Sequence, residues 1–304
     1  MLDKVKKLIV VVGATAVGKT EFCIKLAQKL QTVIISADSR QFYCEMSIGT
    51  AKPSQEELAI VPHYCINTQS IRNEYNAGEY EKDVLALLET LFQTYDKVIL
   101  TGGSGLYIQA ICNGMDNMPQ VPPSLRTSLN QRIEQEGLEV LLAELAILDP
   151  EYYQKVDKAN PQRIVRALEI CLASGKPYSS FRVQQTAKRP FEILKIGLQR
   201  ERAELYARID ARIDKMIAEG LLEEVKSLQA YRNHNALQTV GYKEIFDFLD
   251  QQYDWQECVR LLKRNSRHYA KRQLTWFGKD TQIQWLEVQN AEKWLEEQHI
   301  IPYI

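Results

Sequence analysis

The sequence predicts an α/β fold, in which a P-loop-containing parallel sheet carries helices on both faces and accepts a helical insertion domain. An apolar run at Leu8–Val12 leads directly into the sequence GATAVGKT, and a segment of helical periodicity follows it. Further apolar runs alternate with helical segments, which is typical of a parallel sheet covered on both sides. Because the alternation stops after residue 114 and resumes near residue 190, we expect a P-loop core with a C-terminal basic helix at 1–114 and 190–304, and a helical insertion domain at 115–189.

The predicted strands are short apolar runs, several of which end in glycine or near a carboxylate. Leu8–Val12 is rich in β-branched residues, as expected of a buried parallel strand. KVILTGGSG ends in a second glycine-rich turn, and TVIISADS ends beside the carboxylate of Asp38. The predicted strands lie at 8–12, 32–39, 63–67, 97–105 and 191–199, and the predicted helices of this part at 21–30 and 80–95.

The insertion begins at a proline-bearing connector, NGMDNMPQVPPS, and two helices are expected at 125–134 and 138–148. In the following segment, NPQRIVRALEICLASGKP, Asn160 is a suitable N-cap, Pro161 fits the first helical position and Gly175 is a C-terminal stop. This part of the chain has little strand pattern, which favours helices inserted into the α/β domain.

The composition predicts a cytoplasmic protein with an ample core. The chain has 304 residues, is 45% hydrophobic and carries a net charge of −1, so any basic surface must be local. Its six cysteines form no C-x-x-C pair, which indicates reduced thiols. No apolar stretch approaches the roughly 18 residues of a membrane span, and the N-terminal apolar run is too short for a signal peptide. We expect a monomer without membrane association.

GATAVGKT follows the phosphate-binding pattern G-x-x-x-x-G-K-T. Its backbone N–H groups would surround an anion at the start of the following helix, and Lys19 would add a positive charge. The Thr20 hydroxyl can ligate a phosphate-bound Mg²⁺. The alternative is a glycine turn with a surface lysine. The loop recognises an oligophosphate and leaves open which group the phosphates carry.

Asp38 is a carboxylate at the end of a predicted strand. Ligands of parallel sheets bind at this edge, which favours a functional role, although an Asp beside a Ser is also a common turn cap. KVIL ends in Thr101-Gly102-Gly103 where a Walker B strand would end in aspartate, and the chain has no N-K-x-D motif for guanine. Motifs of nucleotide hydrolysis other than the loop are therefore weak.

The segment from Val259 to Lys279 holds seven Lys and Arg residues and no Asp or Glu. Five of them follow one another at steps of three or four residues, which places them on one stripe of a helix: Arg260, Lys263, Arg264, Arg267 and Lys271. Such a stripe indicates contact with nucleic-acid phosphates. A solvated face, or a face for an acidic partner, is the alternative.

Together these stretches resemble the tRNA dimethylallyltransferase family, also called isopentenyl-tRNA transferases. GATAVGKT, ISADSRQFY, IGTAKP, TGGSGLY, NPQRIVRALEI, QTVGYKE and YAKRQLTWF follow the family's order from residue 8 to about 277. DSRQFY followed by IGTAKP is far more specific than the phosphate loop. A C-terminal Cys/His zinc module of the eukaryotic kind is not expected, so the resemblance is to the bacterial type.

The resemblance implies transfer of a dimethylallyl group from dimethylallyl diphosphate to tRNA, with release of diphosphate. The acceptor is the exocyclic amine of the adenosine immediately 3′ of the anticodon. The implied catalytic residues are Asp38 as general base, with Lys19, Arg212 and Ser104, and the implied cofactor is Mg²⁺, held through Thr20. The diphosphate would be bound by Gly13, Ala14, Thr15, Ala16, Val17, Gly18, Lys19, Thr20, Thr50 and Lys52. The implied tRNA contacts are Asp38, Ser39, Arg40, Gln41, Ser104, Arg126, Gln162, Arg163, Ile164, Val165, Arg166, Lys263, Arg264, Arg267, Lys271 and Arg272.

The chain departs from the family pattern at a few positions. Tyr64 stands where a second histidine is usual, Ser266 replaces a frequent threonine, and Gly278 follows Phe277 where arginine is common. None of them belongs to the implied chemistry. Two rival functions remain open: an ATP-dependent kinase of a small molecule that uses the same loop, and a nucleic-acid-binding module that uses ATP as a switch.

Overall fold

The computed structural model describes residues 5–183 and 186–301. These residues form a six-stranded sheet with the order β3-β2-β4-β1-β5-β6, in which every pairing is parallel. The strands are β1 (Lys7–Gly13), β2 (Ile34–Ser36), β3 (His63–Tyr64), β4 (Lys97–Thr101), β5 (Glu192–Gln199) and β6 (Gln284–Glu287). The predicted α/β class is therefore confirmed. The edge strand β6 was not predicted.

The chain divides into two compact units, Met1–Cys112 together with Lys188–Ile304, and Asn113–Ala187. The first unit contains the sheet. Its helices are α1 (Lys19–Leu30), α2 (Gln55–Ile60), α3 (Ala77–Thr94), α4 (Gly105–Asn113), α9 (Arg202–Ala218), α10 (Leu221–Ser227), α11 (Lys243–Leu249), α12 (Trp255–Phe277) and α13 (Val288–Glu297), of which α4 ends at the boundary residue.

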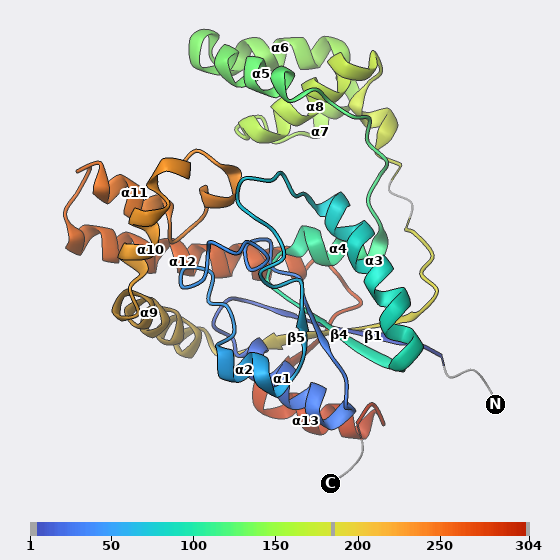
Figure 1. Cartoon of the computed structure of the whole chain (residues 1–304). Coiled ribbons are helices and arrows are strands. Elements are labelled where there is room, and N and C mark those ends of the chain that lie inside the picture. The colour runs from blue at the N-terminus through green and yellow to red at the C-terminus, as the bar shows by residue number, and fades with distance from the viewer. Residues whose placement is uncertain (1–4, 184–185, 302–304) are drawn as a thin grey trace. The chain divides into compact units, whose positions relative to one another are not determined.

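Helices cover both faces of the sheet (Figure 1). Successive side chains of a strand point to opposite faces, and β1 is buried on both. Ile9 and Val11 pack with α1, α9 and α13, whereas Leu8, Val10 and Val12 pack with α3 and α4. This two-sided burial explains why the first strand reads as a continuous apolar run.

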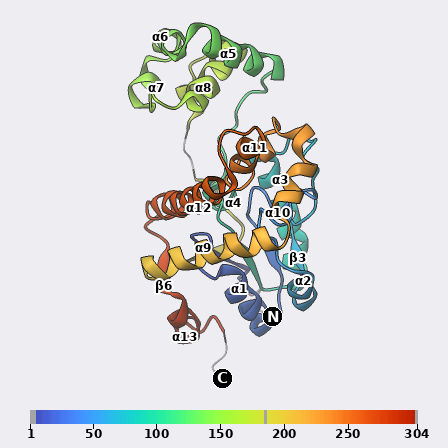
Figure 2. The ribbon, with the colours of Figure 1, turned by 90° about the vertical axis from the view of Figure 1, so that its left-hand side faces the viewer.

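The helices α9 to α12 form a further cluster in the first unit. Its core combines Ile213 and Met216 of α9, Phe246 of α11 and Leu262 of α12 with Phe42 from the segment after β2. Figure 2 shows α9 and α12 running alongside each other, and the two helices pack together. The C-terminal half of α12 reaches the sheet, because Ala270 and Phe277 join the two clusters that cover it.

The second unit contains α5 (Pro123–Glu136), α6 (Leu138–Leu148), α7 (Pro150–Lys155) and α8 (Pro161–Ser174), packed around a core of their own. The caps of α8 are those predicted. The Asn160 side chain accepts a hydrogen bond from the Arg163 amide, Pro161 begins the helix, and Gly175 ends it with a φ of 67°. The helices α2, α4, α7, α10, α11 and α13 were not predicted.

We expect the end of β4 to tolerate no side chain at Gly102, because a Cβ there would lie 2.2 Å from the Ala37 carbonyl oxygen. Gly102→Ala should force the ends of β2 and β4 apart and lower the free energy of unfolding by about 1–3 kcal/mol, measured by urea denaturation. Gly78→Ala is the control, since the nearest atom, Asn76 Oδ1, is 3.3 Å away in the first turn of α3. Equal stability of the two variants would contradict this close approach.

Candidate functional site

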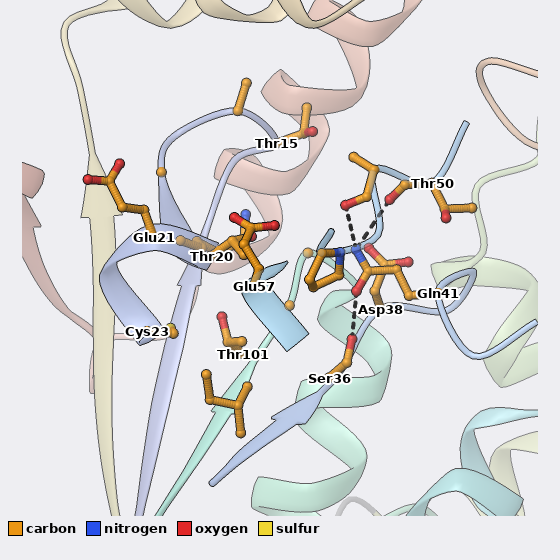
Figure 3. Close-up of a pocket in the computed structure, with 18 of the residues that line it drawn as sticks. Thr15, Thr20, Glu21, Cys23, Ser36, Asp38, Gln41, Thr50, Glu57 and Thr101 are labelled. Carbon is orange, nitrogen blue, oxygen red and sulfur yellow. Dashed lines mark hydrogen bonds between the residues drawn. The ribbon is translucent and has the colours of Figure 1, made fainter. Parts of the chain in front are cut away.

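A cavity of about 270 Å³ lies at the carboxyl ends of β1, β2 and β4 (Figure 3). Thr15, Lys19 and Thr20 of the P-loop line it, as do Asp38 after β2 and Thr101 at the end of β4. The carboxyl ends of parallel strands share one edge of a sheet, so segments that are far apart in the sequence meet here.

Two glycines of the P-loop have positive φ angles, which favour glycine over other residues. Gly13 has a φ of 150°, and a Cβ there would lie 2.7 Å from the Leu198 carbonyl oxygen. Gly18, with a φ of 111°, is the N-cap of α1. The loop residues that line the cavity are Thr15, Ala16, Gly18, Lys19 and Thr20. The cavity lining does not include Gly13, Ala14 or Val17, and the side chains of Ala14 and Val17 are buried. The contact of their backbone N–H groups with phosphate stays a prediction.

Three cationic side chains line the cavity: Lys19 of α1, and Arg208 and Arg212 of α9. Arg208 Nε donates to the Ala16 carbonyl at 2.9 Å, and an Arg212 Nη lies 3.4 Å from the Thr15 hydroxyl. Sequence reasoning missed Arg208, although it precedes Arg212 by one helical turn and therefore lies on the same face of α9. Glu21, Asp38 and Glu57 line the same cavity, so the part beside Lys19 and these two arginines is where an anion could bind.

Burial perturbs these cations. The Lys19 ammonium donates to the carbonyl oxygens of Gly13 and Ala14 at 3.0 and 2.8 Å. Burial, with a smaller contribution from neighbouring Arg212, lowers the pKa of Lys19 to about 8. Burial and the nearby Arg208 also lower the pKa of Arg212. A bound anion would reverse both effects by favouring the charged forms.

Asp38 lines the cavity and also caps a turn. Its Oδ1 accepts the Arg40 amide at 2.9 Å, which is the turn cap that the sequence left open, and its side chain lines the cavity. Ser104, after β4, joins this turn: its hydroxyl accepts the Ser39 amide at 2.8 Å and lies 3.0 Å from the Ser39 hydroxyl. The carboxylate is therefore held in place from two strand ends.

A second cavity, of about 110 Å³, shares Asp38, Arg212 and Tyr269 with the first. Its apolar lining residues are Ala51, Ile209, Ile213, Met216, Leu221 and Val240, and Asp38, Arg40 and Arg212 are the charged ones. Tyr269 of α12, which sequence reasoning missed, lies between the two cavities, and burial raises its pKa to about 12. Asp38 thus lines both the cavity of the P-loop and the cavity that Ile209, Ile213 and Met216 of α9 line.

Two residues of the predicted site form hydrogen bonds that hold neighbouring segments of the chain together. The Gln41 amide accepts from the Ser36 hydroxyl at 2.9 Å and donates to the Thr50 and Ala51 carbonyls, as the dashed lines of Figure 3 show. The Lys52 ammonium donates to the Tyr43 carbonyl and to Asn67 Oδ1, and Lys52 does not line either cavity. The assignment of Lys52 to the diphosphate stays a prediction, without support from the cavity lining. Thr50 itself lines both cavities.

Arg40 lies on the wall of the second cavity. Its guanidinium donates to the carbonyl oxygens of Ser39 and Asn235, at 2.9 and 3.3 Å. These contacts connect the turn after β2 to the segment before α11.

The basic stripe on α12 is divided into two parts. Lys263 and Arg267 pair with Asp214 and Asp210 of α9, at 2.7 and 2.6 Å. The acidic partners of these two residues lie on a neighbouring helix, and their contact with tRNA phosphates stays a prediction. Three other basic residues in this part of α12 are exposed and take no part in these two ion pairs: Arg264, Lys271 and Arg272.

In the second unit, Glu169 of α8 is fully buried and holds two of the predicted arginines. Arg126 forms a two-pronged pair with it, at 2.8 and 2.6 Å, and Arg166 donates to it at 2.5 Å. Gln162 and Arg163 are exposed in the first turn of α8. Ile164 and Val165 were expected to contact tRNA. Their side chains are buried in the core of the unit and cannot make such a contact.

A family model described as IPP transferase matches residues 41–280. The chain belongs to this family. It is 50% identical over 299 residues to tRNA dimethylallyltransferase 1 of Bacteroides fragilis, covering 98% of this chain and 97% of that protein. It is 52% identical over 280 residues to the tRNA dimethylallyltransferase of Cytophaga hutchinsonii, covering 92% of each.

Solved structures are similar over nearly the whole chain. The tRNA isopentenylpyrophosphate transferase of Bacillus halodurans has a TM-score of 0.71 and 34% identity, covering 97% of this chain and 95% of that one. A eukaryotic dimethylallyltransferase described as acting on tRNA has a TM-score of 0.78 and 26% identity, covering 97% of this chain and 77% of that one. The fold and the enzyme class of this IPP transferase family member are thereby established.

A metal ion in this cavity would need ligands beyond the side chains of the described residues. In the described part of the chain, no group of three or more His, Cys, Asp or Glu side chains could hold a metal ion. Mg²⁺ often binds through substrate phosphates and waters with few protein ligands. The Thr20 hydroxyl on the cavity wall suits that mode. Among the described helices, none is long and apolar enough to cross a bilayer.

The pKa of about 8 for Lys19 predicts how anion affinity depends on pH. Because the free ammonium loses its proton as pH rises through 8, and a bound anion favours the protonated form, affinity for inorganic diphosphate should fall up to about tenfold per pH unit above 8. Isothermal titration calorimetry between pH 7 and 9.5 measures it. Lys19→Arg is the control, since its guanidinium stays charged, and a wild-type pH profile in that variant would contradict the role of Lys19.

Proposed function

We propose that this chain transfers the dimethylallyl group of dimethylallyl diphosphate to a tRNA adenosine, the one immediately 3′ of the anticodon, and releases diphosphate. One observation carries the proposal: a cationic P-loop and a carboxylate line the same cavity in a member of the IPP transferase family. The P-loop holds the leaving group, and the carboxylate faces the nucleophile.

The donor lies with its diphosphate in the cationic part of the cavity. Negative charge grows on the leaving oxygen as the carbon–oxygen bond breaks, and preorganised donors stabilise that charge. Lys19 and Arg212 are the charged groups that do so, and Arg208 holds the loop carbonyl of Ala16. Mg²⁺, held by the diphosphate and Thr20, would neutralise further charge.

The acceptor amine lies at Asp38. The exocyclic amine of adenine is a weak nucleophile because its lone pair is delocalised into the ring. A carboxylate that accepts its proton while the new bond forms contributes about 10²–10⁴-fold. The Arg40 amide and the turn held by Ser104 fix the orientation of Asp38. A stacked base cannot reach this cavity, so the adenosine is flipped out of the anticodon loop.

The tRNA is bound by residues of both units. On α12 these are the exposed Arg264, Lys271 and Arg272, and on the helical unit they are Arg126, Arg163, the partly exposed Arg166 and the neutral, exposed Gln162. Such contacts to phosphates supply affinity and register, whereas the flipped base supplies specificity. Since tRNA is the substrate, the enzyme acts in the cytoplasm.

The rival kinase function has less support from the cavity. Phosphoryl transfer in P-loop enzymes uses a carboxylate at the end of a neighbouring strand to help hold Mg²⁺. Here β4 ends in Thr101, whose hydroxyl donates to the Val11 carbonyl at 3.0 Å. The position of a metal-binding aspartate is therefore occupied by a threonine whose side chain is hydrogen-bonded to the backbone.

Replacing the base gives the first test. Asp38→Asn keeps the shape of the side chain and removes its capacity to accept a proton. We expect kcat for transfer of labelled dimethylallyl groups into unmodified tRNA to fall about 10²–10⁴-fold, with tRNA affinity within threefold of wild type. Glu57→Gln, at another carboxylate that lines the cavity, serves as the control. A kcat close to wild type in Asp38→Asn would refute the assigned base.

Salt dependence tests the division of the basic stripe. Replacing Arg264, Lys271 and Arg272 with glutamine should flatten the plot of log affinity for tRNA against log salt by about 0.7–0.9 per residue, because each side chain releases a counterion. Replacing Lys263 and Arg267, which are paired with α9, should change the slope less per residue. A larger change per residue in the second variant would show that the pairs open on binding and contact phosphate.

A further inference from the structure

Gln273 joins the two loops of the site from a third element. Its Oε1 accepts the Thr15 amide of the P-loop at 2.8 Å, and its Nε2 donates to the Gly103 carbonyl, in the turn before Ser104, at 2.9 Å. The side chain is only 5% exposed and lines the first cavity. Both ends of one amide are thus used, and each end is bonded to a different loop.

The contact depends on the absence of a side chain at Gly103. A Cβ at that position would lie 2.2 Å from Gln273 Nε2, and its only other neighbour within 4 Å is Gln273 Cδ. Gly103 does not have a positive φ, so its backbone alone does not require glycine. The approach of Gln273 is what excludes a larger residue there.

Gln273 belongs to a stripe of α12 that faces the site. Tyr269, four residues earlier, lines both cavities, and Trp276, three residues later, lies against Gly105. Residues at these spacings share one face of a helix. The flanking Lys271 and Arg272 are exposed. The same helix therefore presents basic residues to solvent and a fixed amide to the two loops.

We propose that Gln273 is a positioning residue that sets the distance between the P-loop, which holds the leaving group, and the Gly103–Ser104 turn, which orients the general base. This rests on the proposed prenyl transfer. The donor carbon and the acceptor amine must lie within about 3–3.5 Å to react, and a displacement of 1 Å can cost about 100-fold in rate. An amide that is bonded to both loops holds that distance through two hydrogen bonds within the protein.

The test is a double-mutant cycle of Gln273→Ala and Gly103→Ala. We expect Gln273→Ala to lower kcat about 10–100-fold, with tRNA affinity within threefold of wild type. Gly103→Ala alone should also lower kcat, because its Cβ displaces the amide. The double variant should be no slower than Gln273→Ala, since the Cβ then meets no side chain, and coupled residues are not additive. Gln256→Ala, an exposed glutamine in the first turn of α12, is the control.

Affinity for inorganic diphosphate is measured on the same proteins, because it does not require prenyl transfer. We expect it to be about 3–10-fold weaker in Gln273→Ala and to show the same lack of additivity. If the wild-type protein binds diphosphate and transfers no prenyl group, the proposed function fails and these affinities still decide the role of Gln273. Multiplicative losses in the double variant, or wild-type kcat and affinity in Gln273→Ala, would overturn the proposal.

Discussion

The meeting of β1, β2 and β4 at one edge of the sheet is the constraint on which the site depends. Parallel pairing fixes where these strands end, and the missing side chain of Gly102 lets β4 pass the Ala37 carbonyl closely. The P-loop, the turn at Asp38 and the turn at Ser104 therefore emerge side by side. Hydrogen bonds between Ser39 and Ser104 then join the last two.

The site buries positively charged side chains at the carboxyl ends of these strands. Burying cations costs free energy, and the lowered pKa of Lys19 reflects that cost, which the charge of Asp38 offsets only in part. The hydrogen bonds of Lys19 go to carbonyl oxygens and that of Arg212 to a hydroxyl, so in these contacts neither cation is bonded to a carboxylate. Under the proposed function, an anionic diphosphate would offset the remaining cost. Because its charge would grow as it leaves, the same groups would bind the transition state more strongly than the donor.

Features that depend on local sequence could be predicted, and features that depend on distant contacts could not. The P-loop, the caps of α8 and the alternation of strands and helices follow from nearby residues, and they are as expected. The ion pairs of Lys263 and Arg267 could not be predicted, because their partners lie on α9. The hydrogen bonds of Lys52 and Gln41 depend on how the chain folds between β2 and β3, which no helix or strand period predicts. Gln273 could not be found by spacing, since it joins Thr15 and Gly103 across the fold.

The central claim is that the P-loop holds a diphosphate that departs, in contrast to loops that deliver a phosphoryl group. The most direct measurement supplies dimethylallyl diphosphate with a carbon label in the prenyl group and a phosphorus label in the diphosphate, together with unmodified tRNA. The account predicts that carbon label enters the RNA in equal amount to the diphosphate released, and that no phosphorus label enters it. Phosphorus label in the RNA, or release of diphosphate without prenylation of the RNA, would contradict it.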